Sequence, residues 1–354
     1  MNCKKRLIIV LGMHRSGTSA LTKGLEAMGV NLGADFIPPH ADNPKGYWED
    51  SEFFKLNEDL MTALNRSWDD CDSIDPEAFQ QLIQGAFFSR ALELVQRKCQ
   101  QNSTVGIKDP RFSLLLPFWR KVFEVSGVSI FSIVAIRNPL SVARSLAHRD
   151  SLPKAKSLWL WAMYNLQIIS DVSDLPRVVV DYDELMDDPI GELMRVAHYL
   201  GLSVDRELLA SYSTDFLDPK LRHARYSNEQ IEADSECDPV IFEIYQMLRS
   251  EALEVSVPDP AHCRQMASRW QTSLWNLRTL RDLATDFSAE IRVLKRRLTE
   301  EGERISNLES SLYLCRAKVS FLEFCIQNLK SSRSWKITAP LRYLFNFKDF
   351  FSND

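Results

Sequence analysis

The stretch that decides the fold is Arg6-Leu-Ile-Ile-Val-Leu11, followed by Gly12-Met-His-Arg-Ser-Gly-Thr-Ser19. The first part is a short, unbroken apolar run rich in β-branched residues, which is typical of a strand buried on both faces of a parallel sheet. The second part is a glycine-bracketed loop, and a helical pattern follows it from Ala20 to Met28. A strand, such a loop and a helix in this order direct backbone N–H groups at a bound anion.

The loop differs at one position from the common nucleotide-binding phosphate loop, G-x4-G-K-[ST]. Thr18 stands where that motif has lysine, and the cation lies inside the loop instead, at Arg15. Nucleoside triphosphatases use the missing lysine on the β- and γ-phosphates, so this loop suits a phosphate rather than a triphosphate. An ordinary strand-to-helix turn is the alternative interpretation.

Composition limits the classes of protein to consider. A chain of 354 residues allows one sizeable α/β domain and an appendage. The net charge of −5 argues against general nucleic-acid binding. Seven dispersed cysteines without a C-x-x-C pair indicate a reducing compartment, which we take to be cytoplasmic, and no zinc site. No apolar run reaches the length of a membrane span, and the first one is too short for a signal peptide.

Residues 37–50 form a loop rich in Gly, Pro and Asn, soon after the phosphate loop in the sequence. This loop is either an active-site lid or an ordinary surface loop. It offers three candidate bases, His40, Glu49 and Asp50. Asp50 suits the N-cap of a helix over 51–64. Glu49 is the preferred base, because the rings of the preceding Tyr47 and Trp48 would exclude water and raise its pKa, and His40 comes next.

Charged residues follow two further predicted strands. Residues 104–111 combine an apolar first half with Lys108-Asp-Pro-Arg111, and the strand 129–136 runs into Arg137 and a helix that carries Ser145. Ligands in open α/β sheets bind at the carboxyl ends of strands, so the side chain of Lys108 is expected at the ligand-binding edge. If the helix packs back beside the strand, Arg137 and Ser145 reach one phosphate. Structural ion pairs at these strand ends are the alternative.

These motifs, in this order, resemble those of sulfotransferases that use 3′-phosphoadenosine 5′-phosphosulfate (PAPS). The loop over 12–19 resembles the family's 5′-phosphosulfate loop, and Arg137 with Ser145 resembles its 3′-phosphate motif. Val180-Asp-Tyr-Asp-Glu-Leu185, before an Asp-Pro helix start, resembles its closing strand and helix. Residues 43–49 and 108–111 are similar to stretches of bacterial members, and the resemblance covers about residues 5–225.

The resemblance implies a fold, a donor and a set of site residues. The fold class is α/β, a P-loop-like doubly wound parallel sheet flanked by helices. The sequence pattern beyond the family resemblance, described below, adds a long C-terminal coiled-coil helix. The donor is PAPS, with no metal. The 5′-phosphosulfate would be held by Arg15, Ser16, Gly17, Thr18 and Ser19, and the 3′-phosphate by Arg137 and Ser145. Arg15 and Lys108 would stabilise charge during transfer.

The chain departs from the cytosolic branch of this family. That branch has lysine at the position of Arg15, an adenine-stacking tryptophan at Ala20 and a catalytic histidine with no clear match here. The chain is more similar to Golgi-type and bacterial members, in which a glutamate is the base, in line with Glu49.

The C-terminal part has a different pattern. Apolar residues recur at alternating spacings of three and four from Leu277 to Leu329, with Glu301 as the one charged break. This is a heptad seam and predicts a coiled coil over 277–330 that joins copies of the chain, whereas folding back on the domain is the alternative. The predicted division is 1–226, a sulfotransferase-like PAPS-binding domain; 227–276, a helical appendage; 277–330, the coiled coil; and 331–354, a tail.

Two further segments are basic or aromatic. The cluster over 218–225 would close over phosphates or meet an anionic acceptor, or is a solvated loop. The aromatic, basic tail would contact a membrane surface or a partner, or would seal the end of the helical bundle.

The sequence therefore predicts a sulfotransferase that moves a sulfonate group from PAPS to a hydroxyl of an acceptor, on a glycan or cell-surface polysaccharide. Two rival functions remain open. One is a P-loop kinase that uses ATP and Mg²⁺, and the other is a non-catalytic coiled-coil scaffold with a vestigial nucleotide fold.

Overall fold

The structure is a computed structural model that describes residues 5–40, 43–72, 74–100, 102–218, 225–254, 259–275, 278–333 and 336. By its internal packing the chain divides into two units, residues 1–285 and 286–354. Three sequence features lie wholly or largely outside the described residues: Leu277 at the start of the seam, the basic cluster within 219–224, and most of the tail. The four-part division predicted from the sequence stays a prediction.

The first unit is built on a parallel sheet whose strands have the order β2-β1-β3-β4. Its strands are β1 (Arg6–Leu11), β2 (Thr104–Lys108), β3 (Ser129–Ile136) and β4 (Arg177–Asp181). Arg6 pairs with Thr104 on one side and with Ser129 on the other. All carboxyl ends therefore meet at one edge, and the strand order reverses between β1 and β3, where such sheets bind ligands. The predicted fold class is confirmed.

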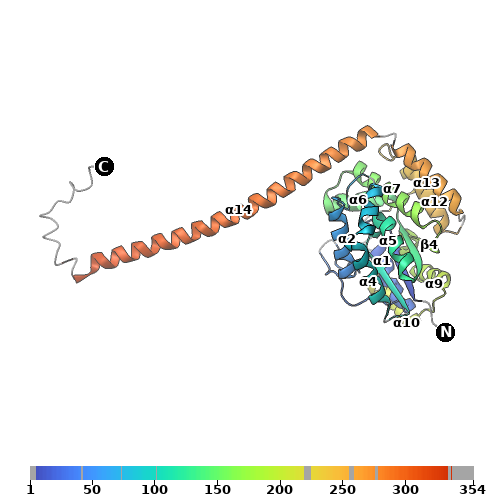
Figure 1. The fold of residues 1–354 in the computed structure, drawn as a ribbon, viewed down its shortest axis with the longest axis horizontal. Helices are drawn as coiled ribbons and strands as arrows, with labels where there is room; N and C mark the ends of the chain where they lie inside the picture. Colours follow the sequence, from blue (N-terminus) through green and yellow to red (C-terminus); the bar gives the residue numbers. More distant parts are fainter. Residues whose placement is uncertain are drawn as a thin grey trace. The chain divides into compact units, whose positions relative to one another are not determined.

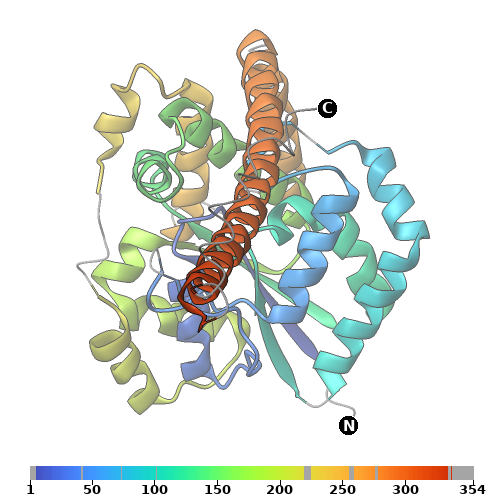
Figure 2. The same ribbon diagram turned by 90° about the vertical axis from the view of Figure 1, so that its left-hand side faces the viewer.

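Helices cover both faces of this sheet (Figures 1 and 2). Alternate residues of β1 point to opposite faces: Leu7, Ile9 and Leu11 join one hydrophobic cluster, and Ile8 and Val10 join the other. The first face is covered by α2 (Ser51–Ala63), α3 (Pro76–Gln84), α4 (Ala86–Gln100), α5 (Phe112–Ser126), α6 (Pro139–Asp150), α7 (Lys154–Val172), α11 (Asn228–Glu232), α12 (Pro239–Ala252) and α13 (Pro260–Trp275). The second is covered by α1 (Thr18–Gly24), the 3₁₀ helix η1 (Leu25–Met28), α8 (Tyr182–Asp187), α9 (Pro189–Leu200), α10 (Arg206–Ser211) and the π-helix η2 (Tyr212–Phe216).

Two helical segments differ from the sequence-based expectation. The stretch after the phosphate loop is α-helical only to Gly24 and continues as the 3₁₀ helix η1, which ends at Gly29 with φ 69°. The apolar pattern over residues 76–99 predicts one helix, but the structure has two, α3 and α4, because the backbone is extended at Gly85. Glycine is a poor residue for a helix interior, so the chain breaks there at little cost.

The second unit contains most of the long helix α14 (Arg278–Ser331). It is continuous from Arg278 through the described part of the predicted seam, and its large apolar side chains from Phe287 to Leu329 are exposed in the single chain. In the part of the chain that the structure describes, no helix has the length and apolar character needed to cross a membrane.

Candidate active site

The loop between β1 and α1 has the backbone of an anion-binding turn. Arg15 and Gly17 adopt left-handed conformations with φ 69° and 88°, and no side chain caps the helix start at Gly17. Two buried polar atoms of the loop, Ser16 Oγ and His14 Nε2, have no hydrogen-bond partner among the described residues. Buried polar groups are nearly always hydrogen-bonded, so these atoms point to a ligand. The loop therefore fits a bound anion.

Gly17 is required by both conformation and space. Its φ of 88° is costly for any residue with a side chain, and a Cβ there would lie 2.2 Å from Cδ2 of Tyr182. Tyr182 in turn lies under the guanidinium of Arg137, 4.4 Å from ring centroid to Cζ. A side chain at position 17 would therefore displace the ring that supports Arg137.

We expect Gly17→Ala to be destabilised and to bind anions poorly. Gly127→Ala is a matched control, because Gly127 also has a positive φ, 71°, but a Cβ there would meet nothing within 4 Å. The control should lose about 1–2 kcal/mol in free energy of unfolding from backbone strain alone, and Gly17→Ala should lose clearly more. Urea unfolding of both variants measures this, and equal losses would show that the Tyr182 contact is unimportant.

Three predicted phosphate-binding residues meet beside the loop. Arg15 Nε donates a hydrogen bond to Ser145 Oγ on α6 over 2.9 Å. Arg137 donates to the backbone carbonyl of Arg15 over 3.2 Å. The helix after β3 thus packs back toward the strand end, as the sequence reasoning required for Arg137 and Ser145 to lie close together.

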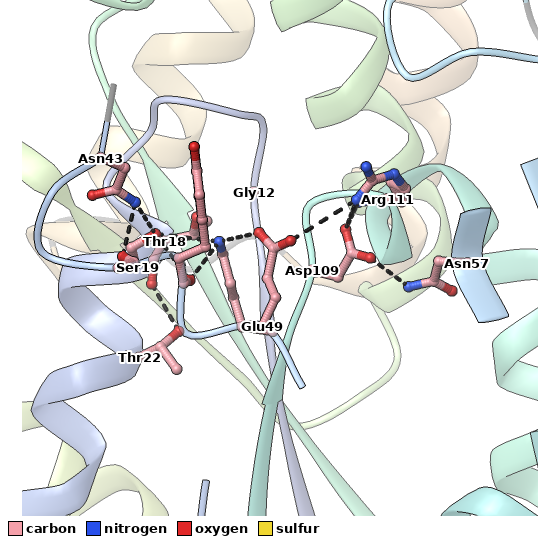
Figure 3. A network of polar contacts seen from close by, with 12 residues as sticks. Gly12, Thr18, Ser19, Thr22, Asn43, Glu49, Asn57, Asp109 and Arg111 are labelled. Carbon is pink, nitrogen blue, oxygen red and sulfur yellow. Dashed lines mark hydrogen bonds and ion pairs between the residues drawn. The ribbon is translucent and has the colours of Figure 1, made fainter. Parts of the chain in front are cut away.

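Lys108, at the end of β2, is the centre of a second cluster, in which Figure 3 labels Ser19, Asn43 and Glu49. Its ammonium donates to Glu49 Oε1 at 2.6 Å, to the Tyr47 carbonyl at 3.0 Å and to Ser19 Oγ at 3.2 Å. Asn43 Nδ2 also donates to Ser19 Oγ, at 3.4 Å. The lid loop, the phosphate loop and β2 are therefore joined at one buried cation.

A chain of hydrogen bonds fixes the end of β2, and Figure 3 shows its central part at Asn57, Asp109 and Arg111. Asp109 accepts from Asn57 at 2.9 Å and from the Arg111 guanidinium at 3.0 Å. Asn57 is itself held by the indole of Trp119, at 2.9 Å, and Arg111 pairs with Glu58 at 2.6 Å. Since Asn57 lies on α2 and Trp119 on α5, two helices hold the strand end that carries Lys108.

Glu49 is a buried carboxylate between two cations. Its side chain lies 2.6 Å from Lys108 and 3.9 Å from Arg111. Burial raises the pKa of Glu49, and the attraction of Lys108 opposes this rise without overcoming it. The direction agrees with the sequence-based expectation. The cause of the burial differs from the expected one, because the ring of Trp48 packs against Phe36, with 5.3 Å between centroids. The carboxylate is therefore buried by the pocket as a whole.

The other lid residues have separate positions. Asp50 accepts hydrogen bonds from the first-turn amides of α2, which makes it the helix cap that the sequence suggested. His40 is exposed and lies on the cavity wall described next.

A cavity of about 600 Å³ lies at the carboxyl edge of the sheet. Its walls include the following predicted site residues: Arg15, Gly17, Thr18, Ser19, His40, Glu49, Lys108 and Arg137. Ser16 and Ser145 do not line the cavity. Both side chains are buried, and Ser145 is connected to the cavity wall through its hydrogen bond from Arg15. Among the described residues, no cluster of His, Cys, Asp or Glu could hold a metal ion.

Several wall residues were not singled out from the sequence: His14, Trp68, Arg111, Arg149 and Tyr182. The His14 ring packs against Trp68 with the two ring planes tilted by 47° and the centroids 4.5 Å apart. Its burial, together with nearby Arg149 and Arg111, holds the pKa of His14 well below 6.5, so the imidazole is neutral. Tyr182 directly follows β4, so the strand-end rule that located Lys108 and Arg137 would also have found it.

The chain is similar to a known protein family and to several solved structures. A family model described as "Sulfotransferase family" matches residues 8–206. Among solved structures, the chain is similar to the sulfotransferase domain of the Synechococcus PCC 7002 olefin synthase, with 19% identity, 76% of this chain and 95% of that chain covered, and a TM-score of 0.37. It is also similar to retinol dehydratase in complex with androsterone and inactive cofactor PAP, with 14% identity, 75% and 80% coverage, and a TM-score of 0.33. No curated protein matches. Because the family model spans more than half of its length, the chain belongs to the sulfotransferase family.

Proposed function

We propose that this enzyme transfers a sulfonate group from PAPS to a hydroxyl of an acceptor, without a metal ion. The observation that carries the proposal is the buried Glu49–Lys108 pair beside the phosphate loop, in one cavity with Arg15 and Arg137. A group transfer from a phosphate oxygen needs cations at the leaving phosphate and a base on the other side. This cavity offers both.

The residues present fit the donor. Arg137 and Ser145 provide a cation and a hydroxyl for the 3′-phosphate, and Arg15, whose side chain donates to Ser145, provides with the loop over Ser16–Ser19 a cation, backbone groups and hydroxyl groups for the 5′-phosphosulfate. The donor supplies the sulfonate, whose bond to the phosphate oxygen breaks as a bond to the acceptor oxygen forms. Glu49 accepts the proton of the acceptor hydroxyl, and Lys108, already beside Glu49, faces the charge on the transferred and leaving groups.

The acceptor is proposed to be a glycan hydroxyl. Aromatic side chains on the cavity wall, Phe54, Trp68 and Tyr47, give flat apolar surfaces of the kind that sugar rings pack against. Extracted polysaccharides incubated with labelled PAPS test this, and label found only on small-molecule or peptide acceptors would contradict it. We also propose a cytoplasmic location from the dispersed cysteines.

Binding of PAP, the desulfonated product, tests the donor. We expect calorimetry to show PAP binding without divalent metal, and Arg137→Ala to weaken it roughly ten- to a hundredfold, because charge-assisted bonds to phosphate are among the strongest hydrogen bonds. Arg144→Ala is the control, since Arg144 lies on α6, the helix that follows Arg137, but is exposed and is not on the cavity wall. Tight binding of ATP with Mg²⁺ and none of PAP would favour a kinase, and binding of neither would favour a scaffold.

A further inference from the structure

The helix α14 exposes a continuous apolar seam. From Phe287 to Leu329 every seam residue with an apolar hydrocarbon side chain is at least 50% exposed in the single chain. Exposed apolar surface of this extent marks an interaction site. The residues at the seam and beside it indicate which partner binds this surface.

The seam has two alternating layers with different side chains. In heptad notation, its a positions are Ile291, Leu298, Ile305, Leu312, Val319 and Ile326. Its d positions are Phe287, Leu294, Glu301, Leu308, Cys315, Leu322 and Leu329. Four of the six a residues are β-branched and four of the seven d residues are leucine. Isoleucine or valine at a with leucine at d favours two parallel strands over three or four, so the majority of the seam favours a pair.

The charges beside the seam are complementary between two copies. In a parallel, in-register pair, each g residue faces the e residue five positions further along the other copy. Three such pairs join opposite charges, Glu290 with Lys295, Arg304 with Glu309, and Lys318 with Glu323. Among the side chains that the structure describes on α14, no g–e pair joins like charges. The charge pattern therefore matches the partner that the seam favours.

We propose that α14 forms a parallel, in-register, two-stranded coiled coil with α14 of a second copy of this chain. The two Glu301 carboxylates then share one layer of the seam. Arg304 lies 3.8 Å from Glu301 on the same helix and partly offsets this charge. This Glu301 layer fixes the register, because a slipped pairing would bury each carboxylate against apolar residues. It also makes the coiled coil less stable than an entirely apolar seam would.

The first test compares two leucines of equal exposure. Leu308 on the seam is 62% exposed and Leu314 on the outer face is 61% exposed. We expect light scattering of the full chain to give twice the chain mass of 40.8 kDa. Leu308→Lys should give the mass of one chain at micromolar concentration, whereas Leu314→Lys should remain a dimer. Equal behaviour of the two variants, or a monomeric or trimeric native chain, would overturn the proposal.

The second test reads direction and register. In the proposed pairing, Cys315 faces Cys315 of the other copy, within the usual reach of a disulfide. Mild oxidation of the full chain should therefore give a covalent dimer that persists in Cys325→Ser and is lost in Cys315→Ser. A dimer by mass that forms no link through Cys315 would be antiparallel or out of register, contrary to the proposal.

A charge exchange tests the g–e pairs independently. Lys318→Glu creates two like-charged pairs per dimer and should weaken dimerisation roughly tenfold. Adding Glu323→Lys should restore it, because the opposite charges are then merely exchanged. Failure of the double variant to recover would show that these residues do not face each other.

Discussion

Glu49→Gln is expected to keep the affinity for PAP and to lose roughly a hundredfold or more in turnover. Glutamine has the same shape and still accepts the hydrogen bond from Lys108 that Glu49 accepts at 2.6 Å, so the cavity should be preserved. It cannot take a proton from the acceptor hydroxyl. Steady-state rates with PAPS and calorimetry with PAP separate the two effects.

The pH dependence gives a second measure of the same role. Burial raises the pKa of Glu49 above its usual 4.5, and the base works only when ionised, so native turnover should fall as the pH drops through that raised pKa. Stability should change in the opposite sense. At pH values between the unfolded and the folded pKa of Glu49, the folded protein binds this proton and the unfolded chain does not. The free energy of unfolding therefore falls as the pH rises through this range. Glu49→Gln should abolish both effects.

His40 is the alternative base, and one pair of variants decides between them. His40→Ala should remain active if Glu49 is the base, because His40 is an exposed residue of the cavity wall. An inactive His40→Ala beside an active Glu49→Gln would assign the role to His40. Full activity in both variants would place the base outside this loop.

Lys108→Met is expected to be inactive and about 3–5 kcal/mol less stable than the native chain. Lys108 is 3% and Glu49 4% exposed, and removing the ammonium leaves the carboxylate buried with Arg111 at 3.9 Å as its nearest remaining cation. A buried charge without its partner costs far more than the intact pair contributes. Chemical denaturation measures the loss.

The double variant Lys108→Met/Glu49→Gln separates stability from chemistry. It removes both charges, so most of the lost stability should return while activity stays absent. A double variant as unstable as Lys108→Met would show that the hydrogen bonds of Lys108 to Tyr47 and Ser19 matter more than its pairing with Glu49.

The strands and their functional ends could be predicted from sequence because the relevant signals are local. β1 and β3 have the predicted bounds, since each is an apolar run that is mostly buried between two layers of helices. Lys108 and Arg137 followed from the rule that parallel strands share a carboxyl edge. Their roles in catalysis and binding stay predictions.

The contacts between elements could not be predicted in the same way. The bond from Arg15 to Ser145 depends on how α6 packs, and no residue pattern encodes that angle. Trp48 has a φ of 57°, which is rare for a tryptophan and turns its ring toward Phe36. His14 lies within the motif itself, yet only the fold brings Trp68 to its ring.

The position of β1 in the middle of the sheet has a consequence for folding. Its two neighbours, β2 and β3, begin at Thr104 and Ser129, so neither pairing is local and the entropy of closing a long loop opposes both. During synthesis the phosphate loop is made before its supports, because Arg137 follows β3 and Tyr182 follows β4. A nascent chain that ends before Tyr182 has the full phosphate-loop sequence without the ring that packs against Gly17, so the anion site takes shape only when the last strand has joined the sheet.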